Sequence, residues 1–187
     1  SLATPGIYNV QNAVAALSFA DYLGADLNLL REGLAQFGGV ARRFHYRGEK
    51  NGISFIDDYA HLPTEVSSVL QAAKEGDWGR IICVFQPHRY SRTQDFWSDF
   101  SHSFQNADVV YVTGIYSAGE SPIPGVSGRL IADTVRESES GKQVVYCEHR
   151  TELVDHIRSE LTQGDLCLTL GAGDITTLPT ELMSGLA

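Results

Sequence analysis

The residues best suited to chemistry lie in segment 85–93, which reads FQPHRYSRT. It follows an apolar run and sets His88, Arg89 and Arg92 just beyond it. A guanidinium group binds a carboxylate through paired hydrogen bonds, and arginines three positions apart can face one anion at the start of a helix. The spacing therefore predicts an anion pocket. The alternative is a pair of solvated arginines near a helix start.

A second polar cluster, residues 57–61, follows another apolar run about one βαβ repeat earlier. Asp57 and Asp58 are suited to hold a ribose hydroxyl or to help bind a metal. His61 is suited to orient a substrate or to accept a proton near neutral pH. The alternative assigns the aspartates to helix capping and His61 to a structural hydrogen bond. Together the two clusters indicate an enzyme site.

Glycine-rich segments give weaker signals. The turn at residues 171–174 follows a predicted strand, but Thr176 stands where a dinucleotide-binding fingerprint needs its third glycine. This favours a tight strand-to-helix turn with Asp174 as a helix cap. Gly141-Lys142 is no phosphate-binding loop either, because Gln143 replaces the required serine or threonine. We expect no P-loop in this chain.

The N-terminal region is expected to be helical. Apolar residues recur every three to four positions across residues 9–23, which predicts a helix, and a second short helix is expected at 28–37. The pattern changes from helical to alternating after Gly38-Gly39. We therefore divide the chain into a helical appendage at 1–37 and a main domain at 38–187.

The main domain reads as alternating strands and helices. Strands at 43–47 and 53–56 flank Asn51-Gly52, a strong signal for a tight antiparallel hairpin. The remaining expected elements are helices 63–75, 93–105, 127–138, 150–162 and 174–183, and strands 80–85, 108–113, 143–147 and 165–170. This order predicts a Rossmann-like, three-layer α/β domain whose sheet is mostly parallel with an antiparallel first strand.

Ligands of such sheets bind beyond the carboxyl ends of the strands. Four loops are expected at that edge, and they hold most of the unusual polar residues of the chain: 57–61, 86–93, 114–120 and 171–174. We expect the candidate site to lie there.

Charge and composition narrow the class of partner. The 187-residue chain has a net charge of −9, which argues against binding to nucleic acid or to anionic membranes. No apolar run approaches the roughly 20 residues of a membrane span. Two local positive clusters nevertheless suit a small anionic ligand: Arg42, Arg43, His45 and Arg47, and then His88, Arg89 and Arg92.

Cysteine usage indicates a reducing compartment. Cys83, Cys147 and Cys167 are odd in number, show no C-x-x-C spacing and lie in or beside strand-like runs. We expect buried free thiols. There is also no basic leader followed by an apolar stretch, so a cytoplasmic protein is predicted.

These motifs resemble those of the Mur ligases of peptidoglycan synthesis, and the resemblance runs through nearly the whole chain. The matching segments are YNVQNA at 8–13, ARRF at 41–44, DDYAHLPTE at 57–65, FQPHRYSRT at 85–93, YSAGESPI at 116–123 and GAGDI at 171–175. Several are typical of the branch that joins L-alanine to UDP-N-acetylmuramate. The resemblance implies an ATP-dependent, amide-forming ligase of cell-wall biogenesis, and hence of cell shape and cell division.

Family proteins have a uridine-nucleotide domain, a central ATPase domain with a P-loop and a C-terminal domain that brings in the amino acid. This chain resembles the last of these, with 1–37 as the terminal helices of the central domain. In the family, ATP phosphorylates the sugar's carboxylate and the amine of alanine attacks the acyl phosphate. ATP and Mg²⁺ would be bound mainly by the central domain, which is not part of this chain. The fragment alone is therefore predicted to be inactive.

The resemblance also implies roles for individual residues. ATP would contact Asn9 and Asn12 at the adenine, Arg43 at the phosphates and Asp58 at the ribose. The acceptor alanine would be bound by Tyr59, His61, His88, Arg89 and Arg92, of which His61, Arg89 and Arg92 are the catalytic candidates. No metal-ligating residue is expected.

The chain departs from the family pattern at two positions. Leu62 and Tyr8 stand where the family often has histidine. The first departure places the weight of imidazole chemistry on His61. The second leaves open how adenine would stack.

Two other functions remain open. One is the recycling ligase of the same family, which attaches a whole tripeptide to UDP-N-acetylmuramate. The other is a nonenzymatic, nucleotide-sensing domain of doubly wound α/β fold.

Overall fold

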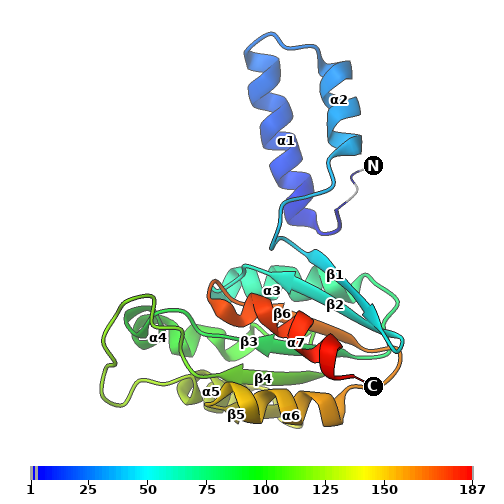
Figure 1. Cartoon of the computed structure of the whole chain (residues 1–187). Helices are drawn as coiled ribbons and strands as arrows, with labels where there is room; N and C mark the ends of the chain where they lie inside the picture. The colour runs from blue at the N-terminus through cyan, green and yellow to red at the C-terminus, as the bar shows by residue number, and fades with distance from the viewer. Residues whose placement is uncertain (1, 3, 187) are drawn as a thin grey trace.

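The computed structural model describes residues 2 and 4–186, which form a helical hairpin and an α/β body (Figure 1). Helices α1 (Ile7–Tyr22) and α2 (Leu27–Gln36) make the hairpin, which stands apart from the sheet. Asp26 caps α2 by accepting hydrogen bonds from the backbone N–H groups of Asn28 and Leu29. The two predicted N-terminal helices are confirmed.

A six-stranded sheet forms the centre of the body, in the order β1-β2-β6-β3-β4-β5. The strands are β1 (His45–Lys50), β2 (Ile53–Asp58), β3 (Ile81–Phe85), β4 (Val109–Thr113), β5 (Gln143–Cys147) and β6 (Leu166–Leu170). Among the strands of the described residues, only the β1–β2 pair is antiparallel. Asn51 and Gly52 turn that hairpin with φ of 55° and 72°, as a two-residue hairpin turn requires. The predicted sheet is confirmed.

Helices cover both faces of the sheet. On one face α3 (Pro63–Lys74), the 3₁₀ segment η1 (Trp97–His102) and α5 (Arg129–Ser138) enclose a core that includes Phe85 and Leu168. On the other, α6 (Arg150–Glu160) and α7 (Leu178–Gly185) enclose a core that includes Phe55 and Val84. Neighbouring residues such as Val84 and Phe85 point to opposite faces, as strand geometry dictates. The three-layer prediction is confirmed.

The single helix predicted at 93–105 is wrong. Helix α4 (Tyr90–Phe96) starts earlier and gives way to η1. The tighter 3₁₀ winding accompanies the packing of Phe100 and Phe104 onto Phe85, with ring centroids 5.1 and 5.5 Å from it. Packing of these aromatic side chains in the core therefore decides the local winding of the chain, rather than the helical spacing of its apolar residues.

The helix predicted at 174–183 is also divided. A 3₁₀ turn, η2 (Asp174–Thr177), precedes α7, and Pro179 lies in the first turn of α7. Proline has no N–H to donate and fits the first turn of a helix, so it favours a new start at this point.

The three cysteines are free and buried, as predicted. Burial raises the pKa of the Cys167 thiol to about 12, and burial together with the Glu152 carboxylate raises the pKa of Cys147 to about 11. Among the described residues, no helix is both long and apolar enough to cross a membrane.

Truncation of Leu168 should destabilise the body. Leu168 is fully buried on β6, between Ile56 and Cys83 of the neighbouring strands. We expect Leu168→Ala to lower the free energy of unfolding by about 2–5 kcal/mol, measured by urea denaturation followed by circular dichroism. The matched control is Leu29→Ala on α2, where the side chain is 67% exposed and the expected change is within about 0.5 kcal/mol. Equal effects would contradict this placement of the core.

Candidate functional site

The carboxyl ends of the parallel strands bring the four predicted loops together. The Gly171 N–H donates to the carbonyl of Asp58 at 3.1 Å, and the Arg89 N–H donates to the carbonyl of Tyr116 at 2.8 Å. His88 and Tyr116 also form an isolated bridge between their loops. The segments 57–61, 86–93, 114–120 and 171–174 therefore share one edge of the sheet, as expected.

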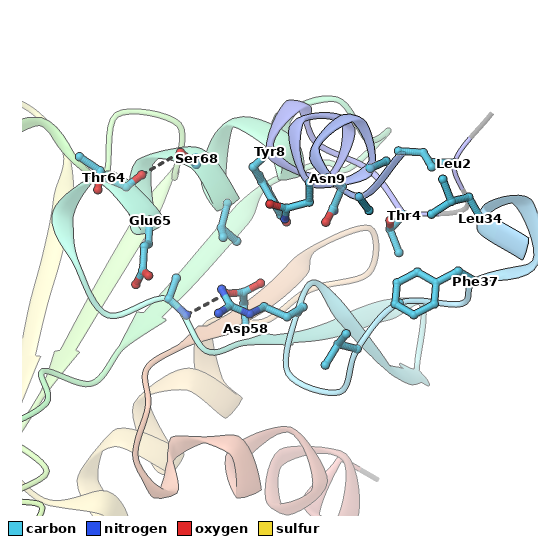
Figure 2. Close-up of a pocket in the computed structure, with 18 residues that line it drawn as sticks. Leu2, Thr4, Tyr8, Asn9, Leu34, Phe37, Asp58, Thr64, Glu65 and Ser68 are labelled. Atoms are coloured by element: carbon cyan, nitrogen blue, oxygen red, sulfur yellow. Dashed lines mark hydrogen bonds between the residues drawn. The ribbon is translucent and has the colours of Figure 1, made fainter. Parts of the chain in front are cut away.

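A cavity of about 700 Å³ lies between the helical hairpin and this edge (Figure 2). All four residues predicted to bind ATP line it: Asn9, Asn12, Arg43 and Asp58. Apolar side chains from the hairpin, the linker after it and α3 complete the walls, among them Leu34, Phe37 and Val69. The volume and the mixture of apolar wall and few polar groups are typical of a small-ligand site.

Tyr8 also lines the cavity, at a position that the sequence analysis noted only as a departure from the family. Tyr8 and Asn9 point from α1 toward the cavity, across from Asp58 (Figure 2). Burial, with the Asp58 carboxylate nearby, raises the pKa of Tyr8 to about 12, so the phenol stays protonated. Its buried hydroxyl has no hydrogen bond of good geometry within the described residues. The phenol is thus a donor available to a ligand.

Asp58 holds the end of the linker against the strand. Its two carboxylate oxygens accept the backbone N–H groups of Phe44 and Ala60, each at 2.7 Å. Burial raises the pKa of Asp58, although these two donors oppose the shift. The carboxylate keeps lone pairs that can face the cavity.

Helix capping by Asp57 or Asp58, the alternative kept open above, is wrong. The start of α3 is satisfied instead by Glu65, whose carboxylate accepts the N–H groups of His61 at 3.0 Å and Leu62 at 3.2 Å. A glutamate at the third helical position commonly reaches back in this way. The sequence showed only half of that signature, because Leu62 at the N-cap has no side-chain acceptor.

Asp57 is fully buried and serves the fold. Its carboxylate accepts hydroxyls from Thr169 at 2.8 Å and Thr176 at 2.7 Å, and it lies 3.6 Å from Arg42 and 3.8 Å from Arg47. Much of the first positive cluster is therefore neutralised inside the protein. Of the two aspartates, Asp58 lines the cavity and Asp57 does not.

A row of rings joins three of the loops, 57–61, 86–93 and 114–120. Tyr59 meets His61 edge-on with ring centroids 5.4 Å apart, His61 lies 5.6 Å from His88, and His88 stacks on Tyr116 at 5.5 Å. Arg92 Nη1 lies 3.0 Å from His88 Nδ1. The structure thus gathers four of the five residues predicted to bind the acceptor: Tyr59, His61, His88 and Arg92.

The protonation of His88 follows from these contacts. Arginine can only donate, so His88 Nδ1 accepts and the ring proton resides on Nε2. Burial and the positive charge of Arg92 lower the pKa of His88, with smaller contributions from His61 and Arg89. His88 is therefore neutral at pH 7.

Arg89, the fifth predicted residue, has a different partner from Arg92. It is the N-cap of α4 with φ of 73°, and its guanidinium lies 3.7 Å from Glu120. Glu120 also accepts the N–H of Ser91 at 3.0 Å and its hydroxyl at 2.7 Å. Glu120 and Tyr116 were not predicted as site residues, although both lie in the loop 114–120 that was expected at this edge.

The glycine turn at 171–173 is a packing device. A Cβ on Gly173 would collide with the side chains of Gln86 and Tyr116. Asp174 does not cap a helix, contrary to expectation: it accepts a hydrogen bond from Gln86 Nε2 at 2.7 Å. Arg42 donates to the carbonyls of Gly171 at 2.6 Å and Gly173 at 3.1 Å, which fixes the turn.

The sequence profile of one protein family, described as Mur ligase, glutamate ligase domain, matches residues 42–173. The chain belongs to this family. The match covers the sheet from the linker to the glycine turn, and hence the loops of the candidate site except Asp174.

Curated relatives agree with the family. The chain is 46% identical over 178 residues to UDP-N-acetylmuramate–L-alanine ligase of Myxococcus xanthus, covering 95% of this chain and 38% of that protein. It is 44% identical over 185 residues to the ligase of the same name from Desulforamulus reducens, covering 99% of this chain and 40% of that protein. The chain therefore spans about two-fifths of the length of these relatives.

Solved structures share the fold. UDP-N-acetylmuramate-alanine ligase of Thermotoga maritima superposes with a TM-score of 0.76 and 32% identity, over 98% of this chain and 38% of that one. A murein peptide ligase of Psychrobacter arcticus superposes with a TM-score of 0.73 over 100% of this chain and 38% of that one, but at 22% identity this shows likeness of fold alone.

Removal of the Arg92 charge should raise the pKa of His88. We expect the pKa of His88 to lie below 6.5 in the unchanged chain and to rise in Arg92→Ala, measured by NMR titration of the imidazole C–H signals. It should stay below 6.5, because burial and the charge of Arg89 remain. Arg129→Ala, far along the chain on α5, is the control and should leave this pKa unchanged. A fall of the pKa in Arg92→Ala would contradict the assignment.

Proposed function

We propose that this chain is the C-terminal, amino-acid-binding part of an ATP-dependent ligase that joins L-alanine to UDP-N-acetylmuramate, the first amino-acid addition to the peptidoglycan stem. One observation carries the proposal: Tyr59 and His61 meet His88, the partner of Arg92, and they belong to the same loop, 57–61, that supplies Asp58 and Ala60 to the wall of the cavity. The 46% identity to a ligase of that name supports the choice of acceptor.

Arg92 and Arg89 are proposed to bind the carboxylate of alanine. Arg92 gives His88 a hydrogen bond and retains further N–H groups, and Arg89 is 49% exposed on its side chain. Both arginines belong to the loop 86–93. The paired N–H donors of a guanidinium group match the two oxygens of a carboxylate. Glu120 would hold Arg89 and the start of α4 in place while the acceptor binds.

His61 is proposed to take the proton that the amine of alanine loses before attack. Its Nδ1 lies 3.0 Å from the carbonyl of Tyr59 and 3.6 Å from the carboxylate of Glu65. Both neighbours are acceptors, so Nδ1 carries the proton and Nε2 is left free as a base. The ring is therefore oriented by two groups and has one nitrogen ready for proton transfer.

The cavity is proposed to hold ATP. Asn9 and Asn12 offer amides for the adenine, Asp58 an acceptor for the ribose and Arg43 a cation for the phosphates, while Tyr8 adds a buried donor. When bound, ATP supplies the phosphoryl group that activates the sugar carboxylate. Mg²⁺ would be held by the phosphates and by the central domain. Within residues 2 and 4–186, the one three-residue group with metal-ligand spacing is elsewhere, at Cys147, Glu152 and His156.

Residues 1–37 are proposed to belong to the central domain of the whole enzyme. Neither α1 nor α2 buries a residue in the described structure, and large apolar side chains such as Val14, Phe19 and Leu29 are more than half exposed. An unpaired apolar surface of this kind indicates a missing packing partner. The curated relatives contain further residues outside the part that this chain matches, and these are a candidate for the missing packing partner. Use of ATP and a nucleotide-linked sugar further suggests a cytoplasmic enzyme.

The decisive experiment changes Arg92 in the full-length enzyme. We expect Arg92→Ala to raise the KM for alanine by about 10- to 100-fold, because a charge-assisted hydrogen bond contributes about 1.5–3 kcal/mol. The KM for ATP should change by less than about threefold. Arg129→Ala is the control and should change neither. An equal rise in both constants would remove Arg92 from the acceptor site, and turnover of a tripeptide in preference to alanine would favour the recycling ligase.

The isolated chain should not catalyse amide formation. It should also bind ATP weakly or not at all in calorimetry, because only part of the nucleotide site is proposed to come from these residues. Measurable ligation by the chain alone would refute the placement of ATP chemistry in the central domain. Tight ATP binding without ligation by the full-length protein would instead favour the nucleotide-sensing function.

A further inference from the structure

Three potential metal ligands meet at the corner between β5 and α6, away from the candidate site. Cys147 is the last residue of β5, and Glu152 and His156 lie one helical turn apart on α6. The Cys147 sulfur, one Glu152 carboxylate oxygen and one His156 ring nitrogen all lie within 4.8 Å of one another. Three strands, β6, β3 and β4, separate β5 from β2 and its Asp58.

The contacts of these side chains leave their grouping unexplained. Within residues 2 and 4–186, none of the three forms a hydrogen bond or an ion pair through its side chain. By contrast, Arg150 on the same helix forms an ion pair with Glu181, with Nε and the carboxylate oxygen 2.9 Å apart. The three ligand atoms are thus close together and have no polar partner within the described residues, although Cys147 also packs in the core beneath α6.

The geometry of the corner fixes which atoms can converge. Residues four apart on a helix lie on one face, so Glu152 and His156 project together. Cys147 is buried, while Glu152 and His156 are exposed. One ligand is therefore anchored in the body, and two flexible side chains can close onto an ion that arrives from solvent.

The ligand types select the metal. Thiolate, imidazole and carboxylate together suit Zn²⁺, whereas Mg²⁺ and Ca²⁺ prefer oxygen ligands alone. Ligand atoms around a tetrahedral zinc ion lie about 3.5 Å apart, a spacing that small side-chain rotations can reach from the observed one. Three protein ligands leave a fourth position for water. On binding, the Cys147 thiol loses its proton to solvent and the thiolate bonds to the ion.

We propose that Cys147, Glu152 and His156 bind a zinc ion at the β5–α6 corner. The ion would tie the edge strand of the sheet to the helix that covers it. This site is independent of the proposed ligase function, and its failure would leave that function untouched.

Cobalt titration of the chelator-treated chain tests the proposal directly. We expect one Co²⁺ per chain, with a thiolate-to-cobalt charge-transfer band and the visible bands of tetrahedral cobalt, all bleached by added Zn²⁺ and retained in excess Mg²⁺. Cys147→Ser should abolish the charge-transfer band. Glu152→Gln and His156→Ala should weaken binding by about tenfold or more.

His149→Ala is the matched control, because His149 is an exposed histidine at the N-cap of α6 that makes no side-chain capping bond. It should bind Co²⁺ like the unchanged chain. Cys147 is buried, so Cys147→Ser can disturb folding, whereas His156 is exposed and His156→Ala should not. Circular dichroism verifies that both variants are folded. Absence of the charge-transfer band in the unchanged chain, its persistence in Cys147→Ser, or an equal loss in His149→Ala would overturn the proposal.

Discussion

The buried carboxylate of Asp57 is the constraint on which the arrangement of this protein depends. It is fully excluded from solvent and is held by hydroxyls of Thr169 and Thr176 and by the guanidinium groups of Arg42 and Arg47. A buried charge is tolerated only when it is fully paired, and loss of one partner is strongly destabilising. These partners come from the linker, β1, β6 and the turn after β6. One carboxylate therefore ties four segments to the end of β2.

The neighbouring aspartate, Asp58, has a different environment, because its side chain points the other way from the strand. Strand geometry points consecutive side chains in opposite directions, so one aspartate enters the protein and the other borders the cavity. The pair in the sequence thus divides into one carboxylate that is paired inside the body and one that lines the cavity while it holds Phe44 and Ala60. A single position of register decides which is which.

The sequence was sufficient for the sheet and for the edge where the loops meet. Its alternating elements follow from local hydrophobic periodicity, and parallel strands necessarily place their carboxyl ends together. Local patterns carry no information about long-range pairing, however. They could not reveal that Asp57 accepts from Thr176, that Glu120 holds Ser91, or that Asp174 accepts from Gln86. The 3₁₀ segment η1 was likewise hidden, because it is tied to the packing of Phe100 and Phe104 on Phe85.

The walls of the 700 Å³ cavity come from two units connected by one short linker. Hairpin residues such as Asn9 form one side, and body residues such as Asp58 form the other. A molecule that fills this space contacts the hairpin and the body at the same time, and therefore links them. The bound molecule fixes the angle between the hairpin and the body. The free-energy cost of immobilising these two units makes its binding weaker. Stiffening the tether would thereby tighten binding without adding a single contact.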